Sequence, residues 1–270
     1  MTVCEYIWRC IYHVVVFESG DKDLQNPRAW GSGFFLNTRN GSVFVTADHV
    51  IHYQDYDEDR RTGIENIVVL PSYKNVEGEI ASYFASLPSF YDFTGYDLEW
   101  PDITDFVDCA VCLIVRDVED VYTDNVKAYD GSLIVPAGLK KCCISVDTIS
   151  KPLESESFIV AGKCHNKVTD VKMEYENAWH EDIKYEGTNG DGNYVFKNAE
   201  PVNHDDWKGL SGSPVFDSHL HLVGMLLRDA EVNDTLIVMP MKRVLEIIEL
   251  AKRMYKDEVD GGENYIEVNG

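Results

Sequence analysis

The sequence is short of basic residues. Of its 270 residues, 24 are Lys or Arg and 47 are Asp or Glu, so the formal net charge is -23 at pH 7. A surface with this excess of negative charge repels phosphate backbones and anionic lipid headgroups. We therefore expect neither nucleic acid nor a membrane as a partner.

Long apolar runs and a secretion signal are also missing. No apolar run approaches the length of about 20 residues that a membrane-spanning helix needs. The first 16 residues carry Glu5 and Arg9 inside their apolar stretch and have no small-residue cleavage site, unlike a signal peptide. These features predict a cytoplasmic protein of 270 residues, long enough to bury a substantial core.

The cysteines do not form an even, regularly spaced framework. They are Cys4, Cys10, Cys109, Cys112, Cys142, Cys143 and Cys164. A secreted domain held together by disulfides usually has an even number at recurring spacings, so we expect these thiols to be reduced.

Two residue pairs have spacings that a metal site can use. Cys109 and Cys112 are three apart, but on a strand such residues point to opposite faces, and no second pair with zinc-ribbon spacing exists. His219 and His221 could share one strand face, which alone is a weak indication. We expect neither a metal nor another cofactor.

Short segments rich in β-branched and aromatic residues, separated by turn residues, recur along the chain. They are 11–17, 30–36, 43–46, 67–70, 80–85, 109–115, 132–135, 142–146, 157–161, 194–196, 214–216, 221–227 and 236–239. Residues 55–61 read as a charged loop, and 116–130 form a polar, acidic interruption near the middle. Two similar sets of strands on either side of 116–130 predict an all-β fold of two β-barrels.

A helix is expected near the C-terminus. Apolar residues follow helical spacing at Met241, Val244, Leu245, Ile248 and Ala251, which predicts an amphipathic helix packed on the second barrel. The predicted organisation is therefore a first barrel over 1–115, a linker over 116–130, a second barrel with its helix over 131–256, and an acidic tail over 257–270.

The stretch 207–216 is a small-residue turn with Ser211 at its centre. Gly209 and Gly212 allow a tight backbone turn in which N–H groups can converge on an oxyanion beside the serine. Clusters of Gly, Ser and Pro are also common in ordinary turns. A catalytic serine additionally needs a histidine base and a carboxylate that orients it.

Both partners have candidates in the first half of the chain. His49 follows the strand pattern 43–46 in a short helical turn, and Asp108 directly precedes the apolar strand 109–115. A solvated histidine and a capping aspartate are the structural alternatives. Asp105 is a second candidate carboxylate, but only Asp108 leads directly into the strand.

The order His49, Asp108, Ser211 resembles that of the chymotrypsin-like (trypsin-like) serine proteases. In the first half of the chain, residues 31–34 resemble the family's glycine-rich strand, 46–50 its Thr-Ala-x-His element and 108–111 the Asp-x-Ala form found in bacterial members. In the second half, residues 209–215 resemble the serine loop, 223–227 the strand that lines the substrate cleft, and 239–241 the segment that leads into the last helix. The chain is thus similar over nearly its whole length to bacterial intracellular trypsin-like peptidases.

The resemblance implies two six-stranded antiparallel β-barrels with a C-terminal helix. It also implies a serine endopeptidase in which His49 is the general base, Asp108 orients the imidazole, and Ser211 forms an acyl-enzyme. The backbone N–H groups of Gly209 and Ser211 would form the oxyanion hole.

Two residues depart from the secreted members of this family. Leu210 replaces the aspartate that pairs with the new N-terminus after zymogen cleavage, which implies control by other means, such as a regulatory protein partner. Trp207 stands where many relatives carry a cysteine, so no disulfide pins the specificity loops.

The resemblance also points to Asp205 as a specificity residue, because it lies six residues before Ser211, where trypsin-type members present a carboxylate to Arg or Lys. A basic P1 residue is the resulting hypothesis. Asp205 could equally be an exposed loop acid, and Arg228 or Asp229 on the opposite wall, next to Leu227 of the cleft strand, could redefine the pocket.

The main hypothesis is a serine endopeptidase that acts on protein or peptide substrates. The alternative is a catalytically silent module of the same fold that binds peptides or a partner protein. By analogy alone, the enzyme could also be an effector of a bacterial sensing or defence system.

Overall fold

The computed structural model describes residues 1–21, 23–39, 41–100, 106–114, 121–128, 131–168, 173–230 and 234–266. The elements of the first part are α1 (Val3–Cys10), β1 (Tyr12–Glu18), β2 (Pro27–Thr38), β3 (Gly41–Thr46), α2 (Asp48–Ile51), α3 (Tyr53–Glu58), β4 (Asn66–Val76), β5 (Glu79–Leu87) and β6 (Ala110–Leu113). They are followed by β7 (Val126–Lys127), β8 (Leu133–Val135), β9 (Ile144–Ser145), the 3-10 turn η1 (Val146–Thr148), β10 (Phe158–Val168), β11 (Met173–Thr188) and β12 (Tyr194–Lys197). The last are α4 (His204–Trp207), β13 (Pro214–Asp217), β14 (Leu222–Ala230), β15 (Thr235–Pro240) and α5 (Met241–Ile266).

The first sheet has the strand order β5-β4-β1-β2-β3-β6, and β9 pairs with β2 in parallel. Its strand β1 is buried on both faces because its apolar residues are continuous. Val14 and Val16 pack into the core of this sheet with Phe44, whereas Val15 and Phe17 pack into a smaller cluster on the other side.

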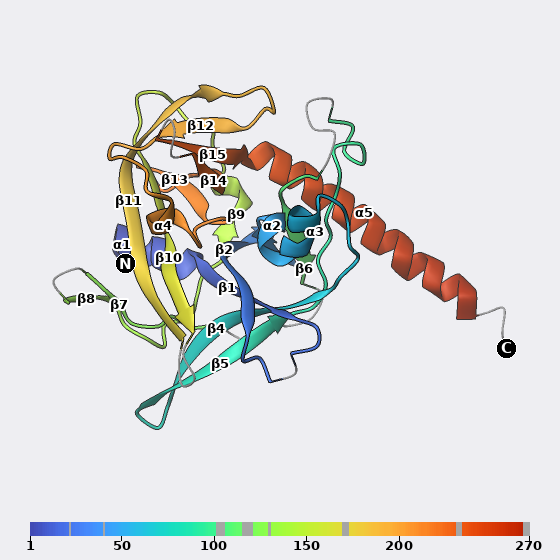
Figure 1. The fold of residues 1–270 in the computed structure, drawn as a ribbon, viewed down its shortest axis with the longest axis horizontal. Coiled ribbons are helices and arrows are strands. Elements are labelled where there is room, and N and C mark those ends of the chain that lie inside the picture. Colours follow the sequence, from blue (N-terminus) through green and yellow to red (C-terminus); the bar gives the residue numbers. More distant parts are fainter. Residues whose placement is uncertain are drawn as a thin grey trace.

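The second sheet is a closed barrel in the order β10-β11-β12-β15-β14-β13 (Figure 1). Buried Phe158 and Phe196 lie edge to face at its centre, with ring centroids 4.8 Å apart. The six-stranded barrel predicted for the second half of the chain is therefore confirmed.

A second closed barrel is not confirmed. Among the described residues the first sheet is an open path whose end strands are β5 and β6. Two segments predicted with the second set of strands also lie outside its barrel, because β8 pairs with β7 and β9 joins the first sheet.

Helices differ more from the prediction than strands do. The helix α1 was not predicted; Thr2 caps it by accepting a hydrogen bond from the Glu5 backbone N–H, and Ile7, Trp8 and Cys10 are buried. The helix α3 occupies most of the segment 55–61 that was read as a loop, so that prediction was wrong. Its first turn contains buried Asp55, which accepts hydrogen bonds from the backbone N–H and hydroxyl of Thr62.

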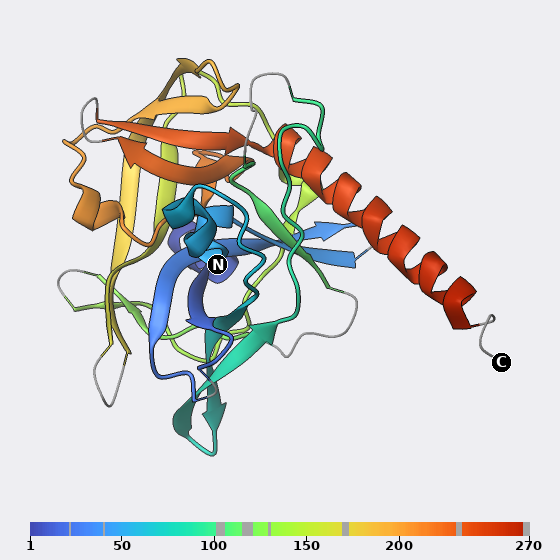
Figure 2. The ribbon, with the colours of Figure 1, turned by 45° about the vertical axis from the view of Figure 1, so that its right-hand side comes forward.

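The C-terminal helix was predicted, but α5 is longer and has a broader contact. It continues past residue 251 through 266, into the acidic segment predicted as a tail, and extends away from the two sheets (Figures 1 and 2). Val244, Ile248 and Ala251 pack into a core that contains Val111 of β6 as well as Met239 of β15. The helix therefore covers the junction of both sheets. None of the helices in the described part of the chain combines the length and apolar character needed to cross a membrane.

Candidate active site

His49 lies on α2, directly after β3. The position of this helix depends on Gly31 in the neighbouring strand β2, because a Cβ added at Gly31 would lie 2.6 Å from both methyl carbons of Val50. Thr46, the last residue of β3, donates a hydrogen bond of 2.8 Å from its hydroxyl to the Ser32 carbonyl. The junction of strand and helix is thus held in place beside the glycine-rich strand.

Asp108 reaches His49 because β6 pairs with β3 in the register Ala110 to Thr46. Both carboxylate oxygens lie 2.9 Å from His49 Nδ1, and the His49 backbone N–H donates to Oδ1 at 3.1 Å. The structure therefore brings together the predicted base and its predicted orienting carboxylate. Asp105, the other candidate carboxylate, lies outside the described residues.

The ion pair changes the protonation of both groups. Burial by itself lowers the pKa of His49, but the charge and hydrogen bond of Asp108 outweigh it and raise that pKa above its ordinary value. Burial by itself raises the pKa of Asp108, but the neighbouring His49 and its two hydrogen bonds hold it below the ordinary value. Asp108 is thus a carboxylate at neutral pH, and it favours a proton on Nδ1 of the ring.

The loop of Ser211 belongs to the second barrel but is fastened to the first sheet. The Ser32 backbone N–H donates to the Ser211 carbonyl at 2.8 Å, and the Ser32 hydroxyl donates to the Gly209 carbonyl at 3.0 Å. Gly212 has a φ of +87°, and a Cβ there would lie 2.0 Å from the Ser32 carbonyl oxygen. Only glycine fits this approach, so the sheet and the serine loop meet without an intervening side chain.

His49 and Ser211 line one open cavity of about 430 Å³. Within the described part of the chain no hydrogen bond joins Ser211 Oγ to the His49 ring. Catalytic hydrogen bonds are often long in enzymes without substrate and shorten in the complex. The cavity is large enough for the side chain of a substrate residue next to the serine.

Two backbone N–H groups beside the serine are available for an oxyanion. In the part of the chain that the structure describes, neither Gly209 N–H nor Ser211 N–H donates to a protein acceptor. Gly209 has a φ of +104°, and a Cβ there would lie 2.5 Å from the Lys163 carbonyl oxygen. The glycine therefore allows a backbone conformation and a close contact that a residue with a side chain would not fit.

The predicted substrate-binding residues occupy different environments. Asp205, Arg228 and Asp229 line the cavity together with His49 and Ser211. Asp205 is exposed on α4, whereas the Asp229 side chain is only 8% exposed and accepts a hydrogen bond from His204 Nδ1 at 3.1 Å. Leu227 instead is buried in the core beneath α5 and does not line the cavity.

Sequence reasoning missed a polar cluster behind the His49–Asp108 pair. Asp48 is fully buried and accepts hydrogen bonds from His52 Nδ1 at 2.6 Å, from the Tyr56 hydroxyl at 3.1 Å and from Arg61 Nη1 at 2.7 Å. The Tyr56 hydroxyl also lies 3.5 Å from Asp108 Oδ1. The sequence contained a signal for this cluster, because residues 48, 52 and 56 recur every four positions, the spacing at which residues of a helix lie on one face.

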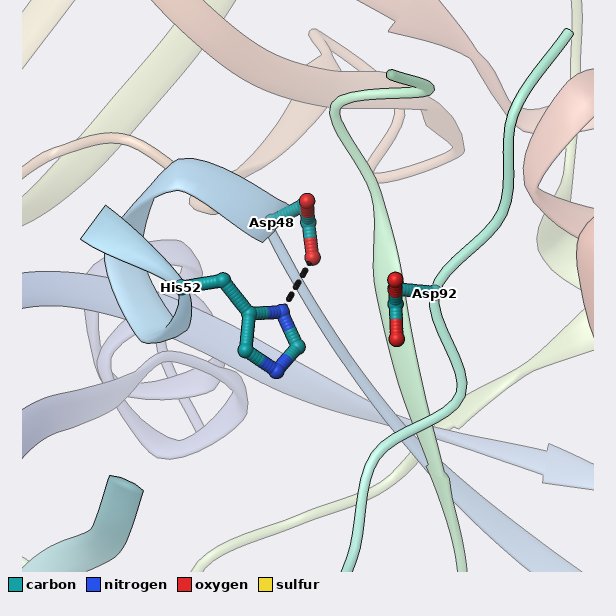
Figure 3. Close-up of side chains that lie close together, drawn as sticks. All are labelled: Asp48, His52 and Asp92. Atoms are coloured by element: carbon teal, nitrogen blue, oxygen red, sulfur yellow. Dashed lines mark hydrogen bonds and ion pairs between the residues drawn. The ribbon is translucent and has the colours of Figure 1, made fainter. Parts of the chain in front are cut away.

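Three side chains of this region, Asp48, His52 and Asp92, lie close enough to hold a metal ion (Figure 3). Arg61 already forms ion pairs with Asp48 at 2.7 Å and with Asp92 at 3.1 Å, and also binds Asp55 at 3.0 Å. The guanidinium therefore balances these carboxylates, and the group is an ion-pair cluster.

The two residue pairs considered for metal binding have other surroundings. Cys109 packs into the core beneath α5 and Cys112 into the core of the first sheet, which confirms that they point to opposite faces. His221 Nδ1 lies 3.0 Å from Asp217, and the rings of His219 and His221 are 6.1 Å apart.

No protein-family model and no curated protein matches the sequence. Among solved structures, the serine endoprotease from Yersinia pestis is 12% identical with a TM-score of 0.49, and the alignment covers 92% of this chain but 66% of that one. The MamO protease domain from Magnetospirillum magneticum is 10% identical with a TM-score of 0.47, covering 89% and 96% of the two chains. Neuropsin, a serine protease expressed in mouse brain, is 11% identical with a TM-score of 0.49, covering 93% and 97%. The roles of individual residues therefore rest on the geometry of the site itself.

Proposed function

We propose that this protein is a serine endopeptidase that cleaves protein or peptide substrates through an acyl-enzyme. The observation that carries the proposal is the ion pair of Asp108 with His49, a histidine that lines one cavity together with Ser211. These three residue types in that arrangement suit the activation of a hydroxyl nucleophile.

The roles follow from the hydrogen bonds. Asp108 holds the proton on His49 Nδ1, which leaves Nε2 free to take the proton of the Ser211 hydroxyl as its oxygen attacks the substrate carbonyl. The N–H groups of Gly209 and Ser211 stabilise the oxyanion that forms. His49 then protonates the leaving amine, and water hydrolyses the acyl-enzyme with His49 again acting as the base.

Control of the enzyme is proposed to need no N-terminal cleavage. Leu210, which replaces the aspartate of the zymogen switch, is fully buried in the core of the closed barrel and anchors the serine loop by apolar contact. Restraint by a regulatory protein partner in the cytoplasm would suit such an enzyme. A role as an effector of a bacterial sensing or defence system is testable from the neighbouring genes.

A basic P1 residue remains the hypothesis that Asp205 supports, since this carboxylate is exposed and lines the cavity. An arginine or lysine side chain of the substrate could pair with it. Cleavage of a peptide library that shows no preference for Arg or Lys at P1 would contradict this hypothesis.

Labelling by a fluorophosphonate probe tests the function. The wild-type protein should form a covalent adduct at Ser211, whereas Ser211→Ala should form none and His49→Ala should react far more slowly. Circular dichroism of each variant controls for folding. A folded wild-type protein that neither reacts with the probe nor cleaves a peptide library would favour the alternative, a silent module that binds peptides or a partner protein.

A further inference from the structure

The cavity at Ser211 has a charge balance opposite to that of the whole chain. Its charged lining consists of Arg28, Lys208, Arg228, Asp205 and Asp229. Two of these charges are already engaged, because Arg28 pairs with Glu18 at 3.0 Å and Asp229 pairs with His204 at 3.1 Å. Lys208 and Arg228 make no ion pair with any residue that the structure describes.

Arg228 is the more informative of the two cations. It follows Leu227, which points into the core, and the pairing of β14 with β15 shifts register between Leu226 and Arg228. Such a bulge re-aims a side chain, here toward the cavity. An arginine that is left without a carboxylate partner in a chain with 47 acidic residues is available to a ligand.

The charge of Arg228 also acts on the proposed reacting groups. Burial and Arg228 both lower the pKa of His49 against the stronger effect of Asp108, and Arg228 helps to keep the pKa of Asp108 low. Arg228 also lines the same cavity as Ser211, so its guanidinium can reach a substrate bound there.

We propose that Arg228, supported by Lys208, binds a carboxylate of the substrate, so that the enzyme prefers peptides with Glu or Asp at one position within three residues of the scissile bond. This inference rests on the proposed peptidase function. Guanidinium and carboxylate form paired, charge-assisted hydrogen bonds that a neutral amide cannot match. Asp205 lies on a different element, α4, so a basic residue could still occupy its side of the cavity.

The test compares hexapeptides that differ only by Glu, Gln or Lys at one position, scanned over three residues on each side of the cleavage site. At one position the wild type should cleave the Glu peptide at least about tenfold faster than the Gln peptide, as expected for one hydrogen bond between charged groups. Arg228→Gln should abolish this difference, and Arg228→Glu should reverse it in favour of Lys. Arg253→Gln on α5 removes the same charge outside the cavity and should keep the wild-type preference.

Binding provides a readout that does not depend on turnover. Ser211→Ala should bind the Glu peptide more tightly than the Gln peptide in calorimetry, and the double variant with Arg228→Gln should not distinguish them. Equal affinities for Ser211→Ala, or an acidic preference that survives Arg228→Gln, would overturn the inference. If the proposed peptidase function itself is wrong, the wild-type protein will not be labelled by the fluorophosphonate probe, which distinguishes this outcome from a failure of the inference about Arg228.

Discussion

Asp108 contacts His49 at two points, the ring Nδ1 at 2.9 Å and the backbone N–H at 3.1 Å. One carboxylate oxygen, Oδ1, makes both contacts, so the ring is fixed relative to its own helix turn. Rotation of the ring would break the first bond while the second remains. The contact thus sets the orientation of Nε2, the atom that faces the serine in the proposed mechanism.

The first prediction concerns pH. The reaction needs a neutral His49 ring, and the ion pair with Asp108 raises the pKa of that ring above 6.5. The rate of fluorophosphonate labelling should therefore increase as the pH rises through a value above 6.5. Asp108→Asn should move this rise in rate to lower pH. It should also reduce the rate itself; the same substitution in the best-studied triad reduces it by a factor on the order of 10⁴. If the labelling rate of the wild type rises with a midpoint below pH 6.5, Asp108 does not stabilise the protonated His49 ring as proposed.

The second prediction concerns Tyr56, a positioning residue behind the site. Burial first, and then the nearby carboxylates, raise the pKa of Tyr56, so its hydroxyl stays protonated; it donates to Asp48 at 3.1 Å and lies 3.5 Å from Asp108 Oδ1. Tyr56→Phe should lower kcat by about tenfold with KM unchanged, the effect of one hydrogen bond to a charged group.

A structural role alone would produce a different result for Tyr56→Phe. The control Tyr96→Phe changes a residue that is 88% exposed and should leave kcat unchanged. If the loss of kcat in Tyr56→Phe only follows a loss of folded protein in thermal denaturation, the positioning role is wrong.

The third prediction concerns the oxyanion hole. Gly209→Ala places a Cβ 2.5 Å from the Lys163 carbonyl oxygen at a φ of +104°, so the backbone must rotate its N–H groups. The labelling rate per folded molecule should decrease by a factor on the order of 10² to 10³. Gly190→Ala is the matched control, because nothing lies within 4 Å of its added Cβ. An unchanged rate in Gly209→Ala would remove Gly209 from the proposed site.

The fourth prediction concerns stability at the junction of the sheets. Lys163 Nζ lies 2.6 Å from Asp124, and the two side chains are only 9% and 13% exposed. Tyr175 donates to the same carboxylate at 2.5 Å and lies 2.8 Å from the Tyr73 hydroxyl of the first sheet. Asp124→Ala leaves the ammonium group buried without its partner, so the free energy of unfolding should fall by about 3 to 5 kcal/mol.

Urea denaturation checks this value. Lys242→Ala breaks an exposed pair with Glu246 at 3.6 Å and should change the free energy of unfolding by less than about 1 kcal/mol. Equal effects of Asp124→Ala and Lys242→Ala would show that the buried pair does not join the sheets.

The positions of the strands and of the main candidate residues could be predicted because they depend on local pattern. The alternation and β-branching of the apolar segments indicated five of the six strands of the closed barrel, but not β11, whose sequence is largely polar. Asp108 was predicted just before a buried strand and His49 just after one. In the structure their side chains meet at these strand ends.

Other features depend on which distant segments pack together. The sequence does not indicate that Ser32 holds the Ser211 loop, because these residues belong to different sheets. The contacts of Tyr56 with Asp48 and Asp108 likewise require α3 to pack against the residue that precedes β6 by two positions.

By itself, the sequence determined the spacing of apolar residues, the local turns and the order of His49, Asp108 and Ser211. The tertiary structure decided that the first sheet is an open path, that Arg61 balances a cluster of carboxylates, and that a bulge aims Arg228 at the cavity. The physical reason is that periodicity tells which side of a strand or helix is buried. Strand register and the pairing of charges depend instead on packing between residues far apart in the chain.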